Sequence, residues 1–182
     1  SIAWWSGLQI FHHVTEDSAA SLLAARLMTA GGSFLIPALF IHFIHALLEV
    51  RNRAWLLLTA YTISVVMGGL AFTTSIIADV APKFFLTNLL IPGPLYEYGV
   101  VFFSGSILYG HVLLYRAYRA STGVRRNQLA YLFWSSLFGY LGGSTNFLIV
   151  FDFNIYPLTP FGTYAVPLYV AATSYAIARY RL

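Results

Sequence analysis

Three histidines have the residue type and spacing that a metal or haem site in a helical bundle requires. His42 and His45 lie one helical turn apart, and His111 lies about eight residues before Arg119 in a later apolar stretch, so all three could share one level of a bundle. Imidazoles at matched levels on facing helices are the usual ligands of such sites. Hydrogen bonding across helices is the simpler interpretation of intramembrane histidines. The cofactor therefore stays unassigned, and a b-type haem or metal site remains an alternative.

A second polar set predicts a ligand-binding patch. Glu97 lies between Tyr96 and Tyr98 in the segment "GPLYEYG", and the segment "GGSTN" carries Thr145 and Asn146 within an apolar stretch. A carboxylate with neighbouring hydroxyl and amide groups could bind the amine or hydroxyl of a small ligand. The alternative is an interfacial carboxylate at a helix N-terminus, where the helix dipole favours negative charge.

Titratable residues also gather near the N-terminal end. His12 and His13 precede Glu16 and Asp17, and this cluster could sense pH or bind a divalent cation, although a solvated loop explains it more simply. Arg26 follows within an apolar run. Its side chain could snorkel to lipid headgroups, or it could form a salt bridge with Glu97.

Several functions are excluded by what the sequence lacks. Lys83 is the single lysine and lies outside the long apolar stretches, so no span can offer a Schiff-base amine for retinal. No carboxylate lies deep in a span, as an ion pump would require. No glycine-rich phosphate loop and no convergent Ser, His and Asp residues are present, so we expect no enzyme activity within these residues. The arginines imply no nucleic-acid partner.

The composition places the chain in a lipid bilayer. Hydrophobic residues make up 59% of it, charged residues make up 9%, and the mean hydropathy is +0.73, whereas charged residues make up roughly a quarter of a soluble domain. A helix needs about 20 apolar residues to cross the hydrocarbon core. The predicted fold is an all-α, polytopic transmembrane bundle in one domain, residues 1–182, with an N-terminal half-span at 1–13 and five full spans at about 18–48, 54–77, 94–119, 127–150 and 158–178.

The arginines predict the orientation of these spans. If each span crosses the membrane once, eight arginines fall on one side, and they are Arg51, Arg53, Arg116, Arg119, Arg125, Arg126, Arg179 and Arg181. The opposite connections carry Glu16, Asp17, Asp79 and Asp152. Lysine and arginine enrichment in short loops marks the cytoplasmic side. We therefore predict a multi-pass membrane protein whose C-terminus is cytoplasmic.

Local features predict weak points within the spans. Pro37 and Pro167 each remove a backbone hydrogen bond and favour a kink. Gly142 and Gly143 permit close approach of a neighbouring helix. The outer connection from Asp79 to Pro94 contains an apolar segment, Phe84 to Ile91, that is too short to span and is expected to lie in the interface or to dip in and return.

Three segments resemble a known family when taken in order. They are "LIPALFIHF" from Leu35 to Phe43, "VRRNQLAYLF" from Val124 to Phe133 and "YAIARYRL" from Tyr175 to Leu182. The set is similar to the N-terminal seven-transmembrane region of bacterial sensor histidine kinases, which also precedes diguanylate cyclases. The resemblance covers nearly the whole chain. It implies that the first helix and the start of the second are absent, and that the five full spans are the third to seventh helices.

The resemblance also implies a function and a location. Such regions lie in the bacterial inner membrane, work as homodimers, and continue from the last helix into a cytoplasmic output domain. The leading hypothesis is a signal-input domain that senses an unidentified small ligand or a bilayer state and passes the signal through its last helix. A structural subunit of a larger membrane complex is the alternative. The resemblance fixes neither the ligand nor its binding residues.

Overall fold

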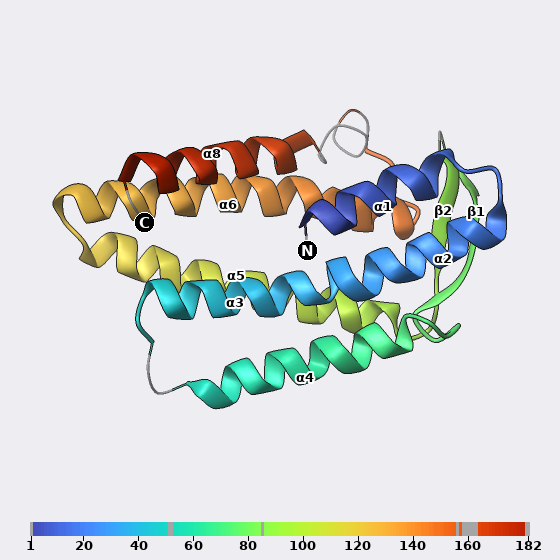
Figure 1. Ribbon diagram of the computed structural model, residues 1–182, viewed down its shortest axis with the longest axis horizontal. Coiled ribbons are helices and arrows are strands. Elements are labelled where there is room, and N and C mark those ends of the chain that lie inside the picture. The colour runs from blue at the N-terminus through green and yellow to red at the C-terminus, as the bar shows by residue number, and fades with distance from the viewer. Residues whose placement is uncertain (1, 51–52, 85, 156, 158–163, 181–182) are drawn as a thin grey trace. The chain divides into compact units, whose positions relative to one another are not determined.

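Long helices form most of the chain in the computed structural model, which describes residues 2–50, 53–84, 86–155, 157 and 164–180. The chain divides into two compact units, Ser1–Ile107 (unit 1) and Leu108–Leu182 (unit 2). Unit 1 holds all the elements up to the first half of α5, and unit 2 holds the remainder. The elements in order are α1 (Ile2–Val14), α2 (Ser18–Met28), η1 (Thr29–Ser33), α3 (Leu35–Leu47), α4 (Ala54–Leu70), β1 (Ile77–Lys83), β2 (Leu86–Pro92), α5 (Tyr96–Ala120), α6 (Gly123–Val150) and α8 (Ala165–Tyr180) (Figure 1).

Most of the predicted spans fall on helices. Within the part of the chain that is described, Ser18–Leu47 and Tyr96–Ala120 are long and apolar enough to cross a membrane, and they match the spans predicted at 18–48 and 94–119. The span predicted at 127–150 lies within α6, and the one at 158–178 overlaps α8, although residues 158–163 lie outside the described ranges. The full set of five spans therefore stays a prediction.

The prediction at 54–77 was too long. The helix α4 ends at Leu70, with Ala71 as its C-cap. Thr73 then donates its hydroxyl proton to the Leu70 carbonyl over 2.7 Å, and such local side-chain bonds compete with continuation of a helix. Turns follow, and β1 begins at Ile77.

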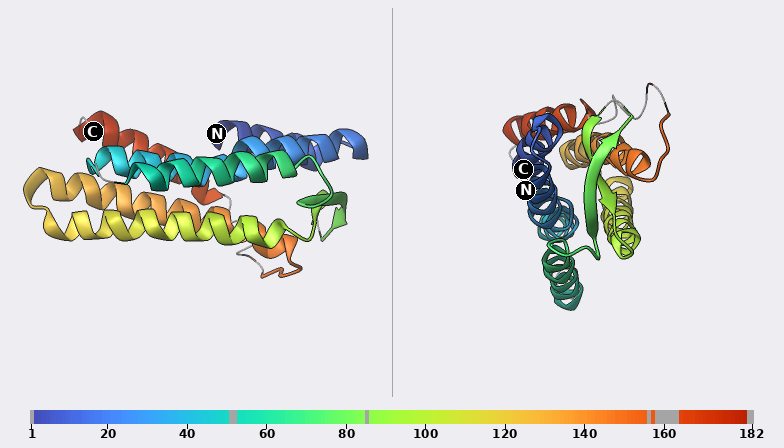
Figure 2. Two further views of the ribbon diagram at one scale, coloured as in Figure 1. Left: turned by 90° about the horizontal axis from the view of Figure 1, so that it is seen from below. Right: turned by 90° about the vertical axis from the view of Figure 1, so that its right-hand side faces the viewer.

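The all-α prediction misses one β-hairpin. The strands β1 and β2 pair antiparallel, with Val80 opposite Leu90 and Ala81 opposite Leu89. Phe84, at the hairpin turn, has a φ of 54°. The end-on view in Figure 2 shows the hairpin running across the helix ends of unit 1 rather than along a helix. The apolar segment predicted to lie at the interface is therefore mostly strand β2.

A π-helical segment interrupts the long helix of unit 1. The Phe34 N–H donates to the Thr29 carbonyl, five residues back, over 3.1 Å. Pro37 has no N–H to donate to the carbonyl of Ser33, four residues earlier. The regular α-helical hydrogen-bond pattern is therefore interrupted here as well as at the π segment. The weak point that we predicted at Pro37 thus follows directly on the segment η1.

The helix α1 packs against this π segment through two tryptophans. A Cβ atom built on Gly31 would lie 2.8 Å from Trp4 Nε1, and one built on Gly32 would lie 2.8 Å from Trp5 Cβ. Only glycine permits such an approach. Trp4 Nε1–H donates to the Leu27 carbonyl over 3.0 Å, so α1 is positioned both by packing and by a hydrogen bond.

In unit 2 the helices α6 and α8 lie side by side along their lengths (Figure 1). Gly139 of α6 lies directly against the Tyr169 side chain of α8, where an added Cβ would overlap the Tyr169 Cβ. One turn along, a Cβ on Gly143 would make a contact of 3.4 Å with Val166 Cγ2. Small residues on α6 thus receive larger side chains of α8, as is usual between helices in membranes.

Candidate functional site

The hairpin is held to the helices of unit 1 by side chains at one end of that unit. This region, called the hairpin end below, comprises β1, β2, the last turn of α1 and the helix α2. His13 Nδ1 donates to the Asn88 carbonyl over 2.7 Å, and Asn88 Nδ2 donates to the Thr15 carbonyl over 2.7 Å. Asn88 is 7% exposed. One buried asparagine therefore connects β2 to the turn between α1 and α2.

The neighbouring His12 is fully buried between α1 and α2. Its Nδ1 lies 2.7 Å from Ser21 Oγ, and Ser21 Oγ donates to the His12 carbonyl over 3.1 Å. Because that serine proton is used, His12 Nδ1–H is the donor, and Nε2 carries a lone pair. His12 Nε2 is buried and has no hydrogen-bond partner among the described residues. The interpretation of His12 as part of a solvated loop was therefore wrong, because the sequence does not show that α1 folds back onto Ser21.

Arg26 of α2 lies under the first strand of the hairpin. Its Nη2 donates to the Ile77 carbonyl over 3.5 Å, the outer limit of a hydrogen bond. Its Nε is buried without a hydrogen-bond partner in the described part of the chain. No ion pair joins Arg26 to Glu97, whose side chain is exposed on the same unit. The Arg26 side chain is half-buried, and its snorkelling to lipid headgroups stays a prediction.

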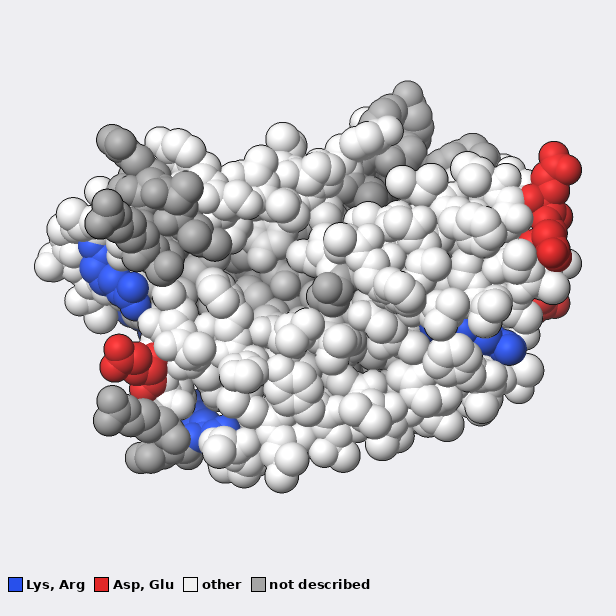
Figure 3. Space-filling view, viewed as in Figure 1, with Lys and Arg blue, Asp and Glu red and all other residues white. Residues whose placement is uncertain are grey.

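Acidic side chains lie at the edge of this region. Most of the described surface in Figure 3 belongs to uncharged residues, and acidic residues gather at the end of unit 1 where α1 meets α2. Asp17 Oδ1 accepts from the N–H of Ala19 at 2.9 Å and of Ala20 at 3.3 Å, so this carboxylate caps α2. Asp79 Oδ1 similarly accepts from the Val80 N–H over 2.8 Å.

The residues of the predicted ligand patch take different positions. At the start of α5, Tyr96 is buried whereas Glu97 and Tyr98 are exposed. In α6, Thr145 Oγ1 donates to the Gly142 carbonyl over 2.7 Å, and Asn146 Nδ2 donates to the Gly143 carbonyl over 2.9 Å. The α5 group belongs to unit 1 and the α6 group to unit 2, so a site that joins them stays a prediction.

Two of the three histidines predicted for metal or haem binding make hydrogen bonds to neighbouring helices, and a cofactor site on them stays a prediction. His42 is exposed on α3, and its Nδ1 lies 2.9 Å from the hydroxyl of Tyr61 on α4. His45, one turn later, is buried, so the two imidazoles differ in their access to solvent. No group of three His, Cys, Asp or Glu side chains placed to hold a metal ion occurs among the described residues. For His42 and His111, hydrogen bonding across helices is the interpretation that the contacts support.

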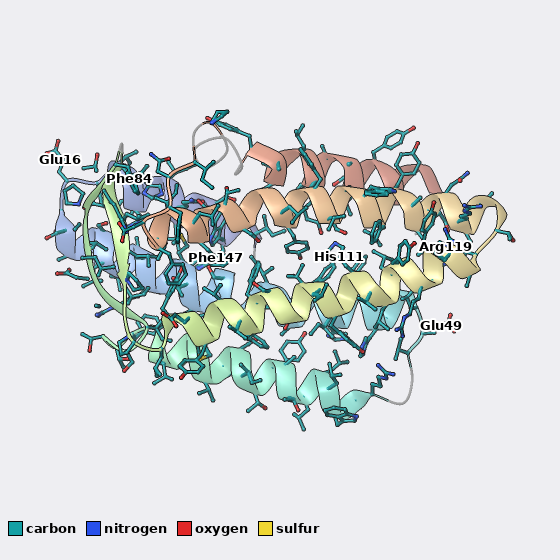
Figure 4. The ribbon with its side chains drawn as sticks, turned by 180° about the vertical axis from the view of Figure 1, so that it is seen from behind. Glu16, Glu49, Phe84, His111, Arg119 and Phe147 are labelled. Carbon is teal, nitrogen blue, oxygen red and sulfur yellow. The ribbon has the colours of Figure 1, made fainter. Side chains whose placement is uncertain are left out.

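His111 belongs to a polar network in unit 2. Figure 4 shows it on α5, pointing toward α6, and its Nε2 lies 3.1 Å from Ser136 Oγ. Ser136 Oγ in turn donates to the Leu132 carbonyl over 2.7 Å, so His111 Nε2–H is the donor in the bond between helices. His111 and Ser136 are 5% and 0% exposed. This buried contact joins α5 to α6.

A second group of hydroxyls joins α6 to α8. Ser135 Oγ lies 3.3 Å from Thr173 Oγ1. The Tyr169 side chain hydrogen-bonds to those of Tyr140 and Thr173, and the two tyrosine rings lie 5.7 Å apart. We did not predict this network. Its signal in the sequence is the four-residue spacing of Tyr169 and Thr173, which places both on one face of α8.

Comparison with known proteins supplies the family. Neither the curated proteins nor the solved structures gave a match. The family model described as the N-terminal 7TM region of histidine kinase matches residues 1–182, the whole of this chain. The resemblance inferred from the three segments is thus confirmed, and so is the assignment to the membrane. The chain belongs to the family of N-terminal seven-transmembrane regions of histidine kinases.

Proposed function

We propose that this chain is the signal-input domain of a membrane sensor protein. It senses a small amphipathic ligand or a state of the bilayer, and it passes the signal through α8 to a cytoplasmic output domain. The observation that carries this proposal is the family match over residues 1–182. The extensive contact of α8 with α6, described above, supports the role of α8, because a helix held along its length moves together with its neighbour.

The orientation of the chain is part of the proposal. The arginine-rich connections lie in the cytoplasm of a bacterial cell, the five predicted spans cross the inner membrane, and α8 emerges on the cytoplasmic side. An epitope inserted directly after Leu182 in the full-length protein tests this topology. Protease added to intact spheroplasts should leave the epitope uncut, and cleavage without lysis would contradict the orientation.

Signalling requires two packing states with different affinities for the stimulus. A ligand shifts the equilibrium only by the difference in its binding free energy between the states, and about 1 to 3 kcal/mol is typical of coupling between sites. The π segment η1 and the adjacent Pro37 are the places where packing can change at low cost. We expect the sensor to work as a homodimer, in keeping with the family.

The patch predicted from the sequence remains a candidate for ligand contact. Glu97 and Tyr98 are exposed on the first turn of α5 and are available to a ligand, whereas Tyr96 and Thr145 are buried and Asn146 is half-buried. Glu97→Gln in the full-length protein should weaken the response to an amine or hydroxyl ligand. Tyr61→Phe, which removes a hydroxyl at His42, is the matched control on α4 and should leave the response unchanged.

Autophosphorylation of the full-length protein tests the function directly. The protein is reconstituted in phosphatidylcholine vesicles of several acyl-chain lengths, and a panel of amphipathic molecules is added to each. We expect phosphate incorporation from labelled ATP to change by about fivefold or more in at least one condition, the lower end of typical coupling. Identical incorporation in every condition would contradict the assignment of an input domain.

A further inference from the structure

Arg26 places a permanent positive charge inside an apolar helix. It lies eight residues after Ser18, the first residue of α2, which corresponds to about 12 Å along a helix axis at ~1.5 Å per residue. A guanidinium in such a place needs hydrogen-bond partners and a counter-charge, because burial of an unpaired charge is costly. Ionisable residues within membrane spans are therefore candidates for function by default, together with the partner that would satisfy them.

The protein itself supplies little of what Arg26 needs. The Ile77 carbonyl is at the limit of hydrogen-bonding distance, and Arg26 Nε is buried without a partner in the described part of the chain. The described residues give Arg26 no carboxylate partner. Two acidic groups of unit 1 already hydrogen-bond elsewhere, because Asp17 caps α2 and Asp79 binds the Val80 N–H. All the acidic side chains of this unit are exposed, and they are Glu16, Asp17, Glu49, Asp79 and Glu97.

The Arg26 side chain is half-buried beside the first strand of the hairpin. Ile77, whose carbonyl it approaches, is fully buried, and the hairpin is connected to the turn between α1 and α2 by the two hydrogen bonds of Asn88. A ligand that binds Arg26 therefore needs an anionic head for the guanidinium and an apolar tail for the apolar helix that carries it.

We propose that Arg26 binds the oxyanion group, a carboxylate or a phosphate, of an amphipathic molecule beneath the β1–β2 hairpin. The planar guanidinium can donate two parallel N–H bonds to such a group, and these charge-assisted bonds are among the strongest in proteins. This proposal rests on the proposed function, because it names the chemical class of ligand that the input domain senses. The oxyanion can come from a free fatty-acid-like molecule or from a lipid headgroup.

Direct binding of two probes separates these sources. The full-length protein, in a non-ionic sugar detergent, is titrated with radiolabelled octanoate and, separately, with radiolabelled dihexanoyl phosphatidylglycerol. Unlabelled 1-octanol, which matches the chain length of octanoate without its charge, serves as the competitor. Arg26→Gln removes the guanidinium. Lys83→Gln removes a positive charge from the hairpin and controls for general electrostatic attraction, and Arg26→Lys provides a second variant that keeps the charge.

We expect at least one anionic probe to bind the unmodified protein and the Lys83→Gln variant, and 1-octanol not to displace it. Arg26→Gln should weaken that binding by about tenfold or more, and Arg26→Lys should weaken it less. Binding of octanoate alone indicates a free carboxylate ligand, and binding of phosphatidylglycerol alone indicates a headgroup. The proposal is overturned if neither probe binds, if 1-octanol displaces both, or if both Arg26 variants bind as tightly as the unmodified protein.

Phosphorylation measured on the same samples separates this proposal from the proposed function. Binding at Arg26 without any change in autophosphorylation would uphold the site and count against its role in signalling. A bilayer-dependent change in autophosphorylation without binding of either probe would uphold the input function and overturn the oxyanion site.

Discussion

At the hairpin end of unit 1, two polar side chains have buried atoms without hydrogen-bond partners in the described part of the chain, whereas along the α6–α8 interface of unit 2 polar side chains hydrogen-bond to one another. Arg26 Nε and His12 Nε2 have no partner among the described residues. In unit 2, Ser135 meets Thr173, and Tyr169 bonds to both Tyr140 and Thr173. The two regions thus carry similar polar side chains, but among the described residues only the first region has buried side-chain atoms without a hydrogen-bond partner.

The difference indicates a division of labour. A polar network whose members are satisfied makes an interface rigid and specific, whereas a buried polar atom without a partner leaves free energy that a ligand can recover. The hairpin end therefore has the character of a binding region, and the α6–α8 interface has the character of a mechanical connection. The following predictions test this contrast.

The largest effect is expected at the α6–α8 interface. Gly139→Ala should destabilise the protein by about 2 to 3 kcal/mol, because the added methyl group overlaps Tyr169 and forces the helices apart. Unfolding monitored by circular dichroism in detergent measures the loss. Gly143→Ala is the matched control, since its Cβ would make only a 3.4 Å contact with Val166. Equal losses in the two variants would mean that α8 does not pack on α6 in this register.

A smaller and more local effect is expected at the hairpin end. Asn88→Ala removes the donor to the Thr15 carbonyl and leaves a part-buried acceptor unpaired, which costs about 1 kcal/mol. Amide hydrogen exchange in β1 and β2 should accelerate by about tenfold or more, while exchange in α6 stays unchanged. Thr87→Ala, at an exposed position on the same strand, is the control. Unchanged exchange in the hairpin would show that Asn88 does not hold it.

The smallest difference concerns two helix N-termini, one in each unit. Asp17 caps α2 with its carboxylate, whereas Thr122 makes no side-chain cap bond at the start of α6. Asp17→Ala should cost about 1 kcal/mol, and Thr122→Ala should cost close to nothing. Thermal unfolding of both variants, compared at one detergent concentration, measures the difference. A larger loss for Thr122→Ala would reverse the assignment of the caps.

The sequence predicted the helices best where apolar stretches were long and unambiguous. The spans at 18–48 and 94–119 coincide with apolar helices because length and hydropathy alone define them. The hairpin was missed because its apolar residues, such as Val80, Leu89 and Leu90, do not alternate clearly with polar residues along the sequence. Such alternation is the pattern that marks a half-buried strand, and these three residues are all buried. A short apolar run does not distinguish a strand from a helix.

The functional contacts were harder to predict because they depend on which faces meet. The burial of His12 follows from the contact with Ser21, nine residues away and on another helix. The contact of Gly139 with Tyr169 depends on the register between α6 and α8, which neither segment specifies alone. The order of three degenerate motifs identified the family, but residue spacing carried no information about partners across helices.

A reversible crosslink between α6 and α8 tests the central claim most directly. Residues 1–182 contain no cysteine, and the hydroxyl oxygens of Ser135 and Thr173 lie 3.3 Å apart, so Ser135→Cys with Thr173→Cys can form a disulfide. Autophosphorylation of the full-length double variant in vesicles of different acyl-chain lengths is measured before and after reduction, with each single variant as a control. We predict that the oxidised form responds to the vesicles as fully as the reduced form, because α6 and α8 already move together. A constant level of phosphorylation in the oxidised form, with the dependence on the bilayer restored by reduction, would contradict the α6–α8 interface as the mechanical connection to the output.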